Sequence, residues 1–340
     1  MHVFVTGATG FIGFHTVLAL LEAGHTVRLG VRNLEKMNAL YEAHGIEITD
    51  YALGEITDKK AVDAALQGCD AVVHTAAMVS LDANLAEQMY HTNVTGTKLV
   101  IGGAVEQGIE SIVHVSSAAA VFDRFAPVVD ESLPLAEQTS AYGRSKSDSE
   151  KFVRGLISEG ARVAITYPSS VLGPQDPAMS EGNQGIAIFF NQTFVKTSSG
   201  MQIIDVRDLA RVHVALLEDQ SSGSYLVSGH FRSWDELGDT LDRVTGRTLR
   251  KFKIPGWMLR GLGAAVDFSS KYISFDTLFT GEAAMYGTQW VYVDDRKVRE
   301  ALAIRYLPLE TTLADTIRWL ADAGHIEAYW AERLDKGSDL

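Results

Sequence analysis

The chain has very few of the features that would point to a secreted, membrane-spanning or nucleic-acid-binding protein. Its single cysteine, Cys69, excludes an internal disulfide framework and fits a reducing cytoplasm. No apolar run reaches the ~18 residues that a membrane span requires, and the chain opens with the strand-like run His2–Val5 rather than a basic segment. A net charge of −13 argues against nucleic acid or an anionic membrane as the main partner. We therefore expect a cytoplasmic protein with no integral membrane span.

Metal-binding spacing is also missing. None of the ten histidines stands in a pattern such as His-Glu-x-x-His, so the sequence predicts no metal site. His114 lies inside an apolar run and is expected in the core. Hydrophobic residues make up 46% and charged residues 21% of the 340 positions, as in ordinary soluble globular proteins. The length predicts one larger domain of about two-thirds of the chain with a smaller attached lobe.

Short apolar runs alternate with stretches of helical periodicity. The expected strands are His2–Thr6, Thr26–Val31, Ile46–Ala52, Ala71–His74, Ser111–Val115, Arg162–Tyr167, Met201–Ile204 and Tyr225–Val227. The expected helices are Phe11–Ala23, Leu34–Ala43, Asp58–Leu66, Asn84–Gln107, Thr139–Ser158 and Leu309–Ala323. Strands rich in Val and Ile with little alternation are typical of a sheet buried on both faces. Their alternation with helices predicts an α/β fold with a doubly wound parallel sheet, the Rossmann arrangement.

The pattern loosens after the sixth expected strand, where prolines and glycines mark a loop. We expect a dinucleotide-binding Rossmann domain over residues 1–172, to which the chain returns at about 201–228. Residues 173–200 and 229–340 are expected to form a smaller α/β substrate-binding lobe. Within it, Ser233-Trp234-Asp235-Glu236 matches a capping box that opens a helix.

A glycine-rich turn follows the first expected strand. Gly7, Gly10 and Gly13 recur every three residues between that strand and an apolar helix. In dinucleotide sites the first glycine permits a tight turn, the second lets the backbone approach the pyrophosphate, and the third lets the helix pack on the strand. The spacing differs from Gly-x-Gly-x-x-Gly, but its place after the first strand favours a cofactor site over a simple turn. The expected cofactor contacts of this loop are Gly7, Thr9, Gly10, Phe11, Ile12 and Gly13.

The end of the second strand favours NADP over NAD. An NAD site usually places Asp or Glu there to bind the ribose 2′-hydroxyl, whereas this chain has Arg32 and no acid. A guanidinium matches a 2′-phosphate in charge and in geometry. Lys36 is either a second clamp or an exposed lysine, and Glu55 and Ile56 are expected to border the adenine. The sequence therefore predicts NADP, with NAD as the alternative.

Tyr142 and Lys146 are spaced by four residues, which places a phenol and an ammonium on one face of a helix. A nearby cation favours the ionised phenol, so we expect Lys146 to lower the pKa of Tyr142 from its usual value near ~10. Such a phenol can exchange a proton with a carbonyl or alcohol oxygen. The pair therefore indicates redox chemistry.

Ser117 follows the expected strand Ser111–Val115, at the sheet edge where such folds bind ligands. Its hydroxyl can hydrogen-bond a substrate oxygen beside the phenol. A nucleophilic role is not supported, because no Gly-x-Ser-x-Gly elbow surrounds it. Ser116 competes for the same role, and either serine can equally be a turn cap.

Several segments together resemble one enzyme superfamily. They are Thr6-Gly7-Ala8-Thr9-Gly10-Phe11-Ile12-Gly13, His74-Thr75-Ala76-Ala77, Asn93-Val94-Thr95-Gly96-Thr97, Val115-Ser116-Ser117-Ala118, Tyr142-Gly143-Arg144-Ser145-Lys146 and Tyr167-Pro168-Ser169-Ser170-Val171-Leu172-Gly173-Pro174. Over nearly its whole length the chain resembles the extended short-chain dehydrogenase/reductase superfamily, in particular its NAD-dependent epimerase/dehydratase family.

The resemblance implies a role for each matching residue. Ser117, Tyr142 and Lys146 would form the catalytic triad, with Tyr142 as acid/base and Ser117 orienting the substrate oxygen. Lys146 would bond the nicotinamide ribose, and Asn93 would be a structural or proton-relay asparagine. The resemblance also implies cofactor contacts from Thr75, Ala76, Ala77, Tyr142, Lys146, Pro168 and Ser169.

Within the superfamily, Val27–Arg32 and Leu307–Leu313 look most like dihydroflavonol reductases and hydroxysteroid dehydrogenases. The loop after Gly173-Pro174 has little of the basic segment with which sugar-nucleotide epimerases hold a diphosphate. The apolar, aromatic segment Gly261–Tyr272 suits a ring-shaped or aliphatic ketone better than a charged sugar. The sequence thus predicts an NAD(P)-dependent oxidoreductase of a small hydrophobic ketone or secondary alcohol. The alternatives are a nucleotide-sugar epimerase or dehydratase that retains NAD, and a non-catalytic dinucleotide-sensing protein.

The same resemblance bears on assembly. Helices Asn84–Gln107 and Thr139–Ser158 resemble the pair through which many relatives dimerise. We therefore expect a homodimer.

Overall fold

A parallel sheet forms the centre of the computed structural model, which describes residues 1–78, 85–137, 141–269 and 280–334. In this part of the chain the sheet has seven strands in the order β10-β6-β5-β4-β1-β2-β3, and every neighbouring pair is parallel. The strands are β1 (His2–Thr6), β2 (Thr26–Val31), β3 (Tyr51–Leu53), β4 (Ala71–His74), β5 (Ser111–Val115), β6 (Val163–Pro168) and β10 (Gly223–Val227). The predicted doubly wound α/β fold is confirmed.

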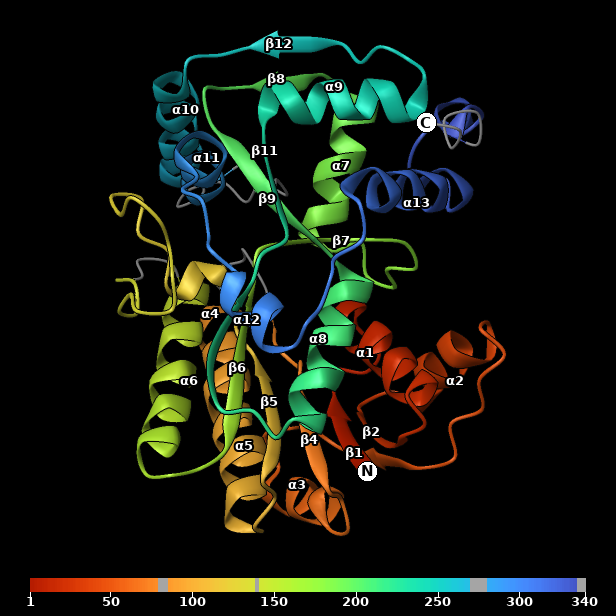
Figure 1. Cartoon of the computed structure of the whole chain (residues 1–340), viewed down its shortest axis with the longest axis vertical. Coiled ribbons are helices and arrows are strands. Elements are labelled where there is room, and N and C mark those ends of the chain that lie inside the picture. Colours follow the sequence, from red (N-terminus) through yellow and green to blue (C-terminus); the bar gives the residue numbers. More distant parts are fainter. Residues whose placement is uncertain (79–84, 138–140, 270–279, 335–340) are drawn as a thin grey trace.

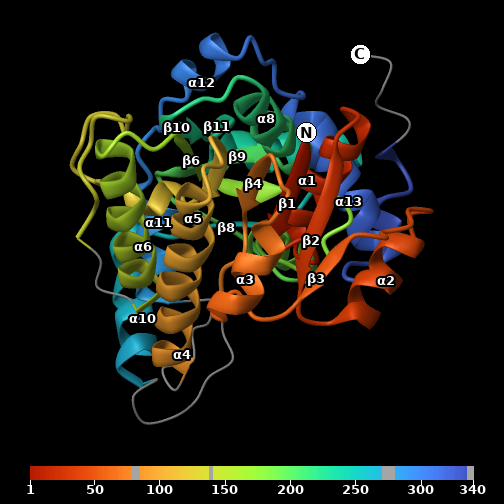
Figure 2. The ribbon, with the colours of Figure 1, turned by 90° about the horizontal axis from the view of Figure 1, so that it is seen from below.

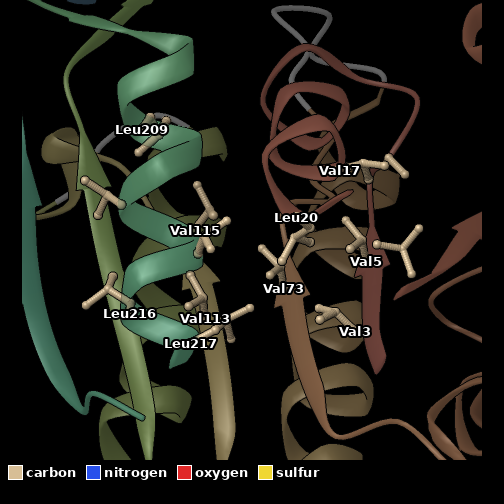
Figure 3. Close-up of a cluster of buried hydrophobic side chains, with 14 of the residues drawn as sticks. Val3, Val5, Val17, Leu20, Val73, Val113, Val115, Leu209, Leu216 and Leu217 are labelled. Atoms are coloured by element: carbon tan, nitrogen blue, oxygen red, sulfur yellow. The ribbon is translucent and has the colours of Figure 1, made fainter. Parts of the chain in front are cut away.

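Helices cover both faces of this sheet, which explains why its central strands are apolar on both sides. They are α1 (Phe11–Glu22), α2 (Leu34–Glu42), α3 (Lys59–Leu66), α4 (Ala86–Tyr90), α5 (Gly96–Glu106), α6 (Ala141–Ser158) and α8 (Val206–Glu218). On one face, α1, α2 and α8 bury Val3 and Val5 of β1. On the other face, α3, α5 and α6 bury Phe4 of the same strand. Figure 3 shows the first of these clusters, in which Val3 and Val5 of β1 lie near Val17 and Leu20 of α1.

Two expected elements differ from the structure. The strand predicted over Ile46–Ala52 begins only at Tyr51, because Ile46 and Ile48 pack against the core outside the sheet. The helix predicted over Asn84–Gln107 has its start outside the described residues. It is interrupted by a π-helical turn at His91–Thr95 between α4 and α5. Single π turns inside helices occur frequently at functional sites.

A smaller lobe lies over the carboxyl ends of the strands of the large sheet. In Figure 1 these strands run upward from the end at which the N-terminus lies, and the lobe is at the top. Its strands are β7 (Ser170–Leu172), β8 (Phe194–Lys196), β9 (Gly200–Asp205), β11 (His230–Ser233) and β12 (Lys251–Lys253). Its helices are α7 (Glu181–Asn191), α9 (Trp234–Thr245), α10 (Gly256–Ser269), α11 (Gly281–Gln289) and α13 (Leu309–Asp322), whereas α12 (Arg296–Ala301) packs against β10 of the large sheet. The lobe has a core of its own, built around Leu237, Leu313 and Trp330. None of the helices in the described ranges has both the length and the apolar character of a membrane span.

The sheet order places a ligand crevice at a defined point. Strand β1 lies between β2 and β4, so the chain winds outward in opposite directions from this position. In open α/β sheets, ligands bind outside the carboxyl ends of the strands where the order reverses. Seen from below in Figure 2, α5 and α6 lie side by side on one side of the sheet, with α1 on the other. The fold therefore predicts a site between the ends of β1, β4 and β5.

The predicted capping box is confirmed at the start of α9. The amide of Glu236 donates to the Ser233 hydroxyl at 3.2 Å, and the Ser233 amide donates to the Glu236 carboxylate at 2.8 Å.

Ser233→Ala should lower the free energy of unfolding by about 1 kcal/mol because an N-terminal amide of α9 loses its acceptor. Urea denaturation measures this change. Ser158→Ala, at an exposed helix end, is the control and should stay within about 0.5 kcal/mol. An equal effect of the two substitutions would contradict the prediction.

Candidate active site

The glycine-rich turn joins β1 to α1 with very little space around its backbone. Gly7 has a φ of +71°, and a methyl group placed on it would lie 2.5 Å from Thr75 Oγ1. A methyl group on Gly13 would lie 2.2 Å from the carbonyl oxygen of Gly7. The Gly10 amide donates to that same oxygen at 2.9 Å. A larger residue at Gly13 would therefore force α1 away from the turn, and one at Gly7 would force the turn away from the segment after β4.

This turn fits a pyrophosphate. Gly10 precedes α1 and has no side chain to cap it, so amide groups of the first turn remain available to an anion. Phe11 is buried, whereas Thr9 and Ile12 are half-buried. The helix dipole adds to the attraction for negative charge. The residues present thus match the needs of a dinucleotide cofactor.

The segment after β4 forms the neighbouring wall. The Thr75 hydroxyl donates to the carbonyl oxygen of Thr6 at 2.8 Å, and the Ala76 amide donates to the Thr6 hydroxyl at 3.3 Å. Ala77 is exposed. These bonds fix the segment directly beside the glycine turn.

The residues assigned to the adenine end lie on the other side of the turn. Arg32 follows β2 with 71% of its side chain exposed, and its guanidinium is 3.9 Å from the Glu55 carboxylate. Lys36 is exposed in the first turn of α2. Ile56 packs against α5, where a methyl group on Gly96 would lie 2.5 Å from its Cδ1. An exposed, loosely paired guanidinium can reorient toward a phosphate.

Tyr142 and Lys146 lie on α6, where the Lys146 ammonium is 5.9 Å from the centre of the Tyr142 ring. Burial lowers the pKa of Lys146 to about 8, against the opposing influence of the Glu150 carboxylate. The expected fall of the Tyr142 pKa below its usual value is not found in this structure. Burial raises the pKa of Tyr142, and the carboxylates of Glu181 and Glu282 raise it further. Desolvation and two negative charges therefore favour the neutral form of the phenol.

The structure distinguishes the two adjacent serines after β5. The Ser116 hydroxyl is buried and donates to the Glu150 carboxylate at 2.6 Å. Ser117 is half-exposed and caps a short 3-10 helix, accepting from the Ala119 amide at 3.2 Å. Ser116 is thus held in the interior, whereas Ser117 has access to solvent.

Asn93 lies in the π-helical turn and joins three parts of the chain. Its side chain accepts from the Met78 amide at 2.7 Å and donates to the Met78 carbonyl oxygen at 3.0 Å. It also donates to the hydroxyl of Ser145, which lies between Tyr142 and Lys146, at 2.9 Å. The asparagine therefore holds the segment after β4 against α6.

Pro168 and Ser169 lie at the end of β6. Pro168 pairs with Val227 of β10, and the Ser169 hydroxyl donates to the carbonyl oxygens of Gln202 and Ser228 at 3.0 and 2.7 Å. Both residues are therefore fixed at the carboxyl edge of the sheet.

Sequence reasoning missed Glu181 and Glu282, which start α7 and α11 in the lobe. Burial raises the pKa of Glu181, and the charge of Glu282 raises it further. No sequence signal connects these acids to Tyr142, because only the packing of the lobe brings them together. Among the residues that the structure describes, no group of three or more His, Cys, Asp or Glu could hold a metal ion.

Aromatic rings lie beside this acidic region. Phe122 contacts Tyr286 edge-on and Trp290 at ring-centre distances of 5.2 and 5.1 Å. Trp290 also lines an open hollow of about 480 Å³ together with Arg124 and Phe231. Of the segment Gly261–Tyr272, residues 261–269 belong to α10 and the rest lies outside the described residues.

Comparison with known proteins agrees with this geometry. The family model described as the NAD dependent epimerase/dehydratase family matches residues 3–228. A putative dihydroflavonol 4-reductase of Synechocystis is 27% identical over 333 residues, covering 95% of this chain and 96% of the relative. Cinnamoyl-CoA reductase 1 of Arabidopsis thaliana is 33% identical over 259 residues, covering 71% and 74%. A UDP-glucose 4-epimerase of Neisseria meningitidis is 29% identical over 284 residues, covering 73% and 84%.

The crystal structure of gox2253 is similar to this chain over 96% of its length and 99% of that chain, with a TM-score of 0.80 and 26% identity. Sequence and structure thus agree on one assignment. The chain belongs to the NAD-dependent epimerase/dehydratase family of the extended short-chain dehydrogenases/reductases and is an NAD(P)-dependent enzyme of the oxidoreductase type.

Proposed function

We propose that the protein is an NADP-dependent reductase or alcohol dehydrogenase that interconverts a small hydrophobic ketone and its secondary alcohol. The observation that carries this proposal is the pairing of Tyr142 with Lys146 on α6, beside the glycine turn that fits a dinucleotide. We also infer that the smaller lobe binds the substrate, since it lies over the carboxyl edge of the sheet. The bounds expected for it, residues 173–200 and 229–340, differ from the structure in two places: β7 and β9 form a sheet with β11 in the lobe, and α12 packs against the large sheet.

In the proposed reaction hydride would pass between the substrate carbon and a nicotinamide bound at this site. Tyr142, kept neutral by burial, donates its proton to the carbonyl oxygen as the alcohol forms, and takes it back in oxidation. The Lys146 ammonium stabilises the phenolate that remains. Ser117 donates a hydrogen bond to the substrate oxygen, and Asn93 keeps α6 in place. Each of these roles belongs to a side chain at the same edge of the sheet.

The cofactor proposal is NADP. Its support is Arg32, whose exposed guanidinium follows β2 at the position where an NAD site has an acid. Lys36 lies four residues later, in the first turn of α2, and adds a second positive charge. Gly7, Gly10 and Gly13 would approach the pyrophosphate.

The substrate proposal rests on charge and on the aromatic rings. Glu181 and Glu282 act on Tyr142 through their negative charges, which oppose an anionic substrate such as a sugar diphosphate. Phe122, Tyr286 and Trp290 offer apolar surface nearby. The relative named a putative dihydroflavonol 4-reductase, matched over 95% of this chain, supports a neutral ring-shaped ketone.

The second candidate is a nucleotide-sugar epimerase that retains NAD, which the UDP-glucose 4-epimerase relative favours. Tight NAD that survives purification, together with binding of a nucleoside diphosphate sugar, would support this candidate. A screen of ketones and secondary alcohols with both nicotinamides, read by absorbance of the reduced ring, separates the two. Turnover of neutral ketones supports the reductase proposal.

Tyr142→Phe tests the proton donor. Removing the phenolic hydroxyl should lower kcat by at least about 100-fold, because general acid catalysis contributes that much or more. NADPH binding, followed by fluorescence, should change little. Tyr329→Phe, which removes an exposed phenol far from α6 in the sequence, is the matched control. Full turnover by Tyr142→Phe would remove the assigned acid/base, and a parent protein that binds neither NADPH nor NADH would refute the proposed function.

Arg32→Ala tests the choice of cofactor. Loss of a charge-assisted contact to the 2′-phosphate should weaken NADPH binding by about 10- to 100-fold and leave NADH binding within about threefold. Calorimetry with both cofactors measures the two constants. Arg32→Lys keeps the charge and should lie between parent and alanine variant. An equal loss for NADH and NADPH would contradict the assignment.

We also propose that the protein is a homodimer assembled through α4, α5 and α6. These helices lie together at the surface, where the Tyr90 hydroxyl of α4 donates to the Asp148 carboxylate of α6 at 3.0 Å. Sedimentation at micromolar concentration should give twice the subunit mass. A single-subunit mass would contradict the proposal.

A further inference from the structure

Glu150 is a completely buried acid on α6, one helical turn after Lys146 and two after Tyr142. We propose that Glu150 is a positioning residue for the reaction, whose carboxylate fixes α6 to the segment after β5 that contains Ser117 and serves as the counter-charge of Lys146. The inference rests on the proposed function in one respect, the assignment of Tyr142, Lys146 and Ser117 to the reaction.

The carboxylate of Glu150 joins α6 to two strand ends. It accepts a hydrogen bond from the Ser116 hydroxyl after β5 and one from the Tyr167 hydroxyl of β6, both at 2.6 Å. Arg154, one turn further along α6, donates its Nε hydrogen at 2.9 Å. Ser116 is the residue directly before Ser117, so the same carboxylate fixes the backbone that presents the Ser117 hydroxyl. The distance between Ser117 and the Tyr142 helix therefore depends on Glu150.

The charge of Glu150 also acts on Lys146. Its carboxylate raises the pKa of Lys146, in opposition to burial, which lowers it to about 8. The other titratable groups near Lys146 are His74 on β4 and His114 on β5. Burial lowers the pKa of His74 to about 3 and that of His114 well below its usual value, so both rings are neutral. Tyr142 on the same helix is neutral as well.

Among the described groups near Lys146, Glu150 is therefore the one whose negative charge keeps the buried Lys146 ammonium protonated. Its ion-pair partner Arg154 has 31% of its side chain exposed, at 2.8 Å from the carboxylate. Water screens an exposed cation much more than it screens a buried anion. Stability alone does not require this charge, because well-packed apolar residues often replace a buried ion pair without loss.

Glu150→Gln tests the inference, because it removes the charge and keeps the shape and an acceptor for Ser116. The direction of the expected shift follows from the pKa of Lys146. Without the carboxylate of Glu150 this pKa falls, so Lys146 loses its proton at a lower pH. In the plot of kcat/KM for carbonyl reduction against pH, the fall at high pH (the high-pH limb) should occur roughly one pH unit lower. NADPH affinity at pH 6, where Lys146 is protonated in both proteins, should stay within about threefold. Glu159→Gln, an exposed acid just beyond α6, is the matched control and should leave the limb unchanged.

Ser116→Ala separates positioning from charge. It removes one hydrogen bond to Glu150 and leaves the carboxylate, so kcat should fall about tenfold while the high-pH limb stays in place. An unshifted limb in a folded Glu150→Gln protein would overturn the counter-charge role. If Glu150→Gln does not fold, unchanged kcat in Ser116→Ala would overturn the positioning role.

A direct titration of Lys146 needs no turnover. Lysine-selective NMR, assigned with Lys146→Arg, should show Lys146 losing its proton at lower pH in Glu150→Gln than in the parent. An unchanged titration refutes the inference even where the parent reduces ketones. A parent protein that binds neither NADPH nor NADH refutes the proposed function, while the titration still decides the role of Glu150.

Discussion

Parallel pairing of the strands is the constraint on which the rest of this structure depends. Because β1, β4, β5 and β6 all run in one direction, the residues that follow them meet at a single edge of the sheet. The glycine turn, Thr75, Ser117 and Ser169 come together in this way, although more than 150 residues separate the first from the last. The helices that cover both faces make this edge the place where polar side chains approach a ligand from the sheet.

Burial controls the chemistry of the groups at this edge. Desolvation lowers the pKa of Lys146 and raises that of Tyr142, so both side chains favour their neutral forms more than they would in water. Hydrogen bonds compensate for other buried groups, as the contacts of Asn93 with Met78 and Ser145 illustrate. His114 is an exception, because neither of its ring nitrogens has a partner among the described residues.

Local patterns in the sequence predicted most elements and failed where packing overrode them. The periodicity of α1, α3 and α13 matched the structure to within one or two residues, because each buries one apolar face. The third strand was placed too early, since Ile46 and Ile48 are apolar yet pack outside the sheet. The π turn at His91–Thr95 leaves no mark on hydrophobic periodicity, because it changes the backbone bonding pattern and not the buried face.

The sequence by itself determined the fold class, the glycine turn and the spacing of Tyr142 and Lys146, since each depends on residues close together in the chain. Only the tertiary structure decided which charges surround that pair. Glu181 and Glu282 reach Tyr142 from the lobe, and Glu150 binds Ser116 across the sheet edge. Burial of Tyr142, together with the charges of Glu181 and Glu282, reversed the expected direction of the Tyr142 pKa. The physical reason is that burial and charge act through space, whereas sequence spacing reveals only neighbours along one helix or strand.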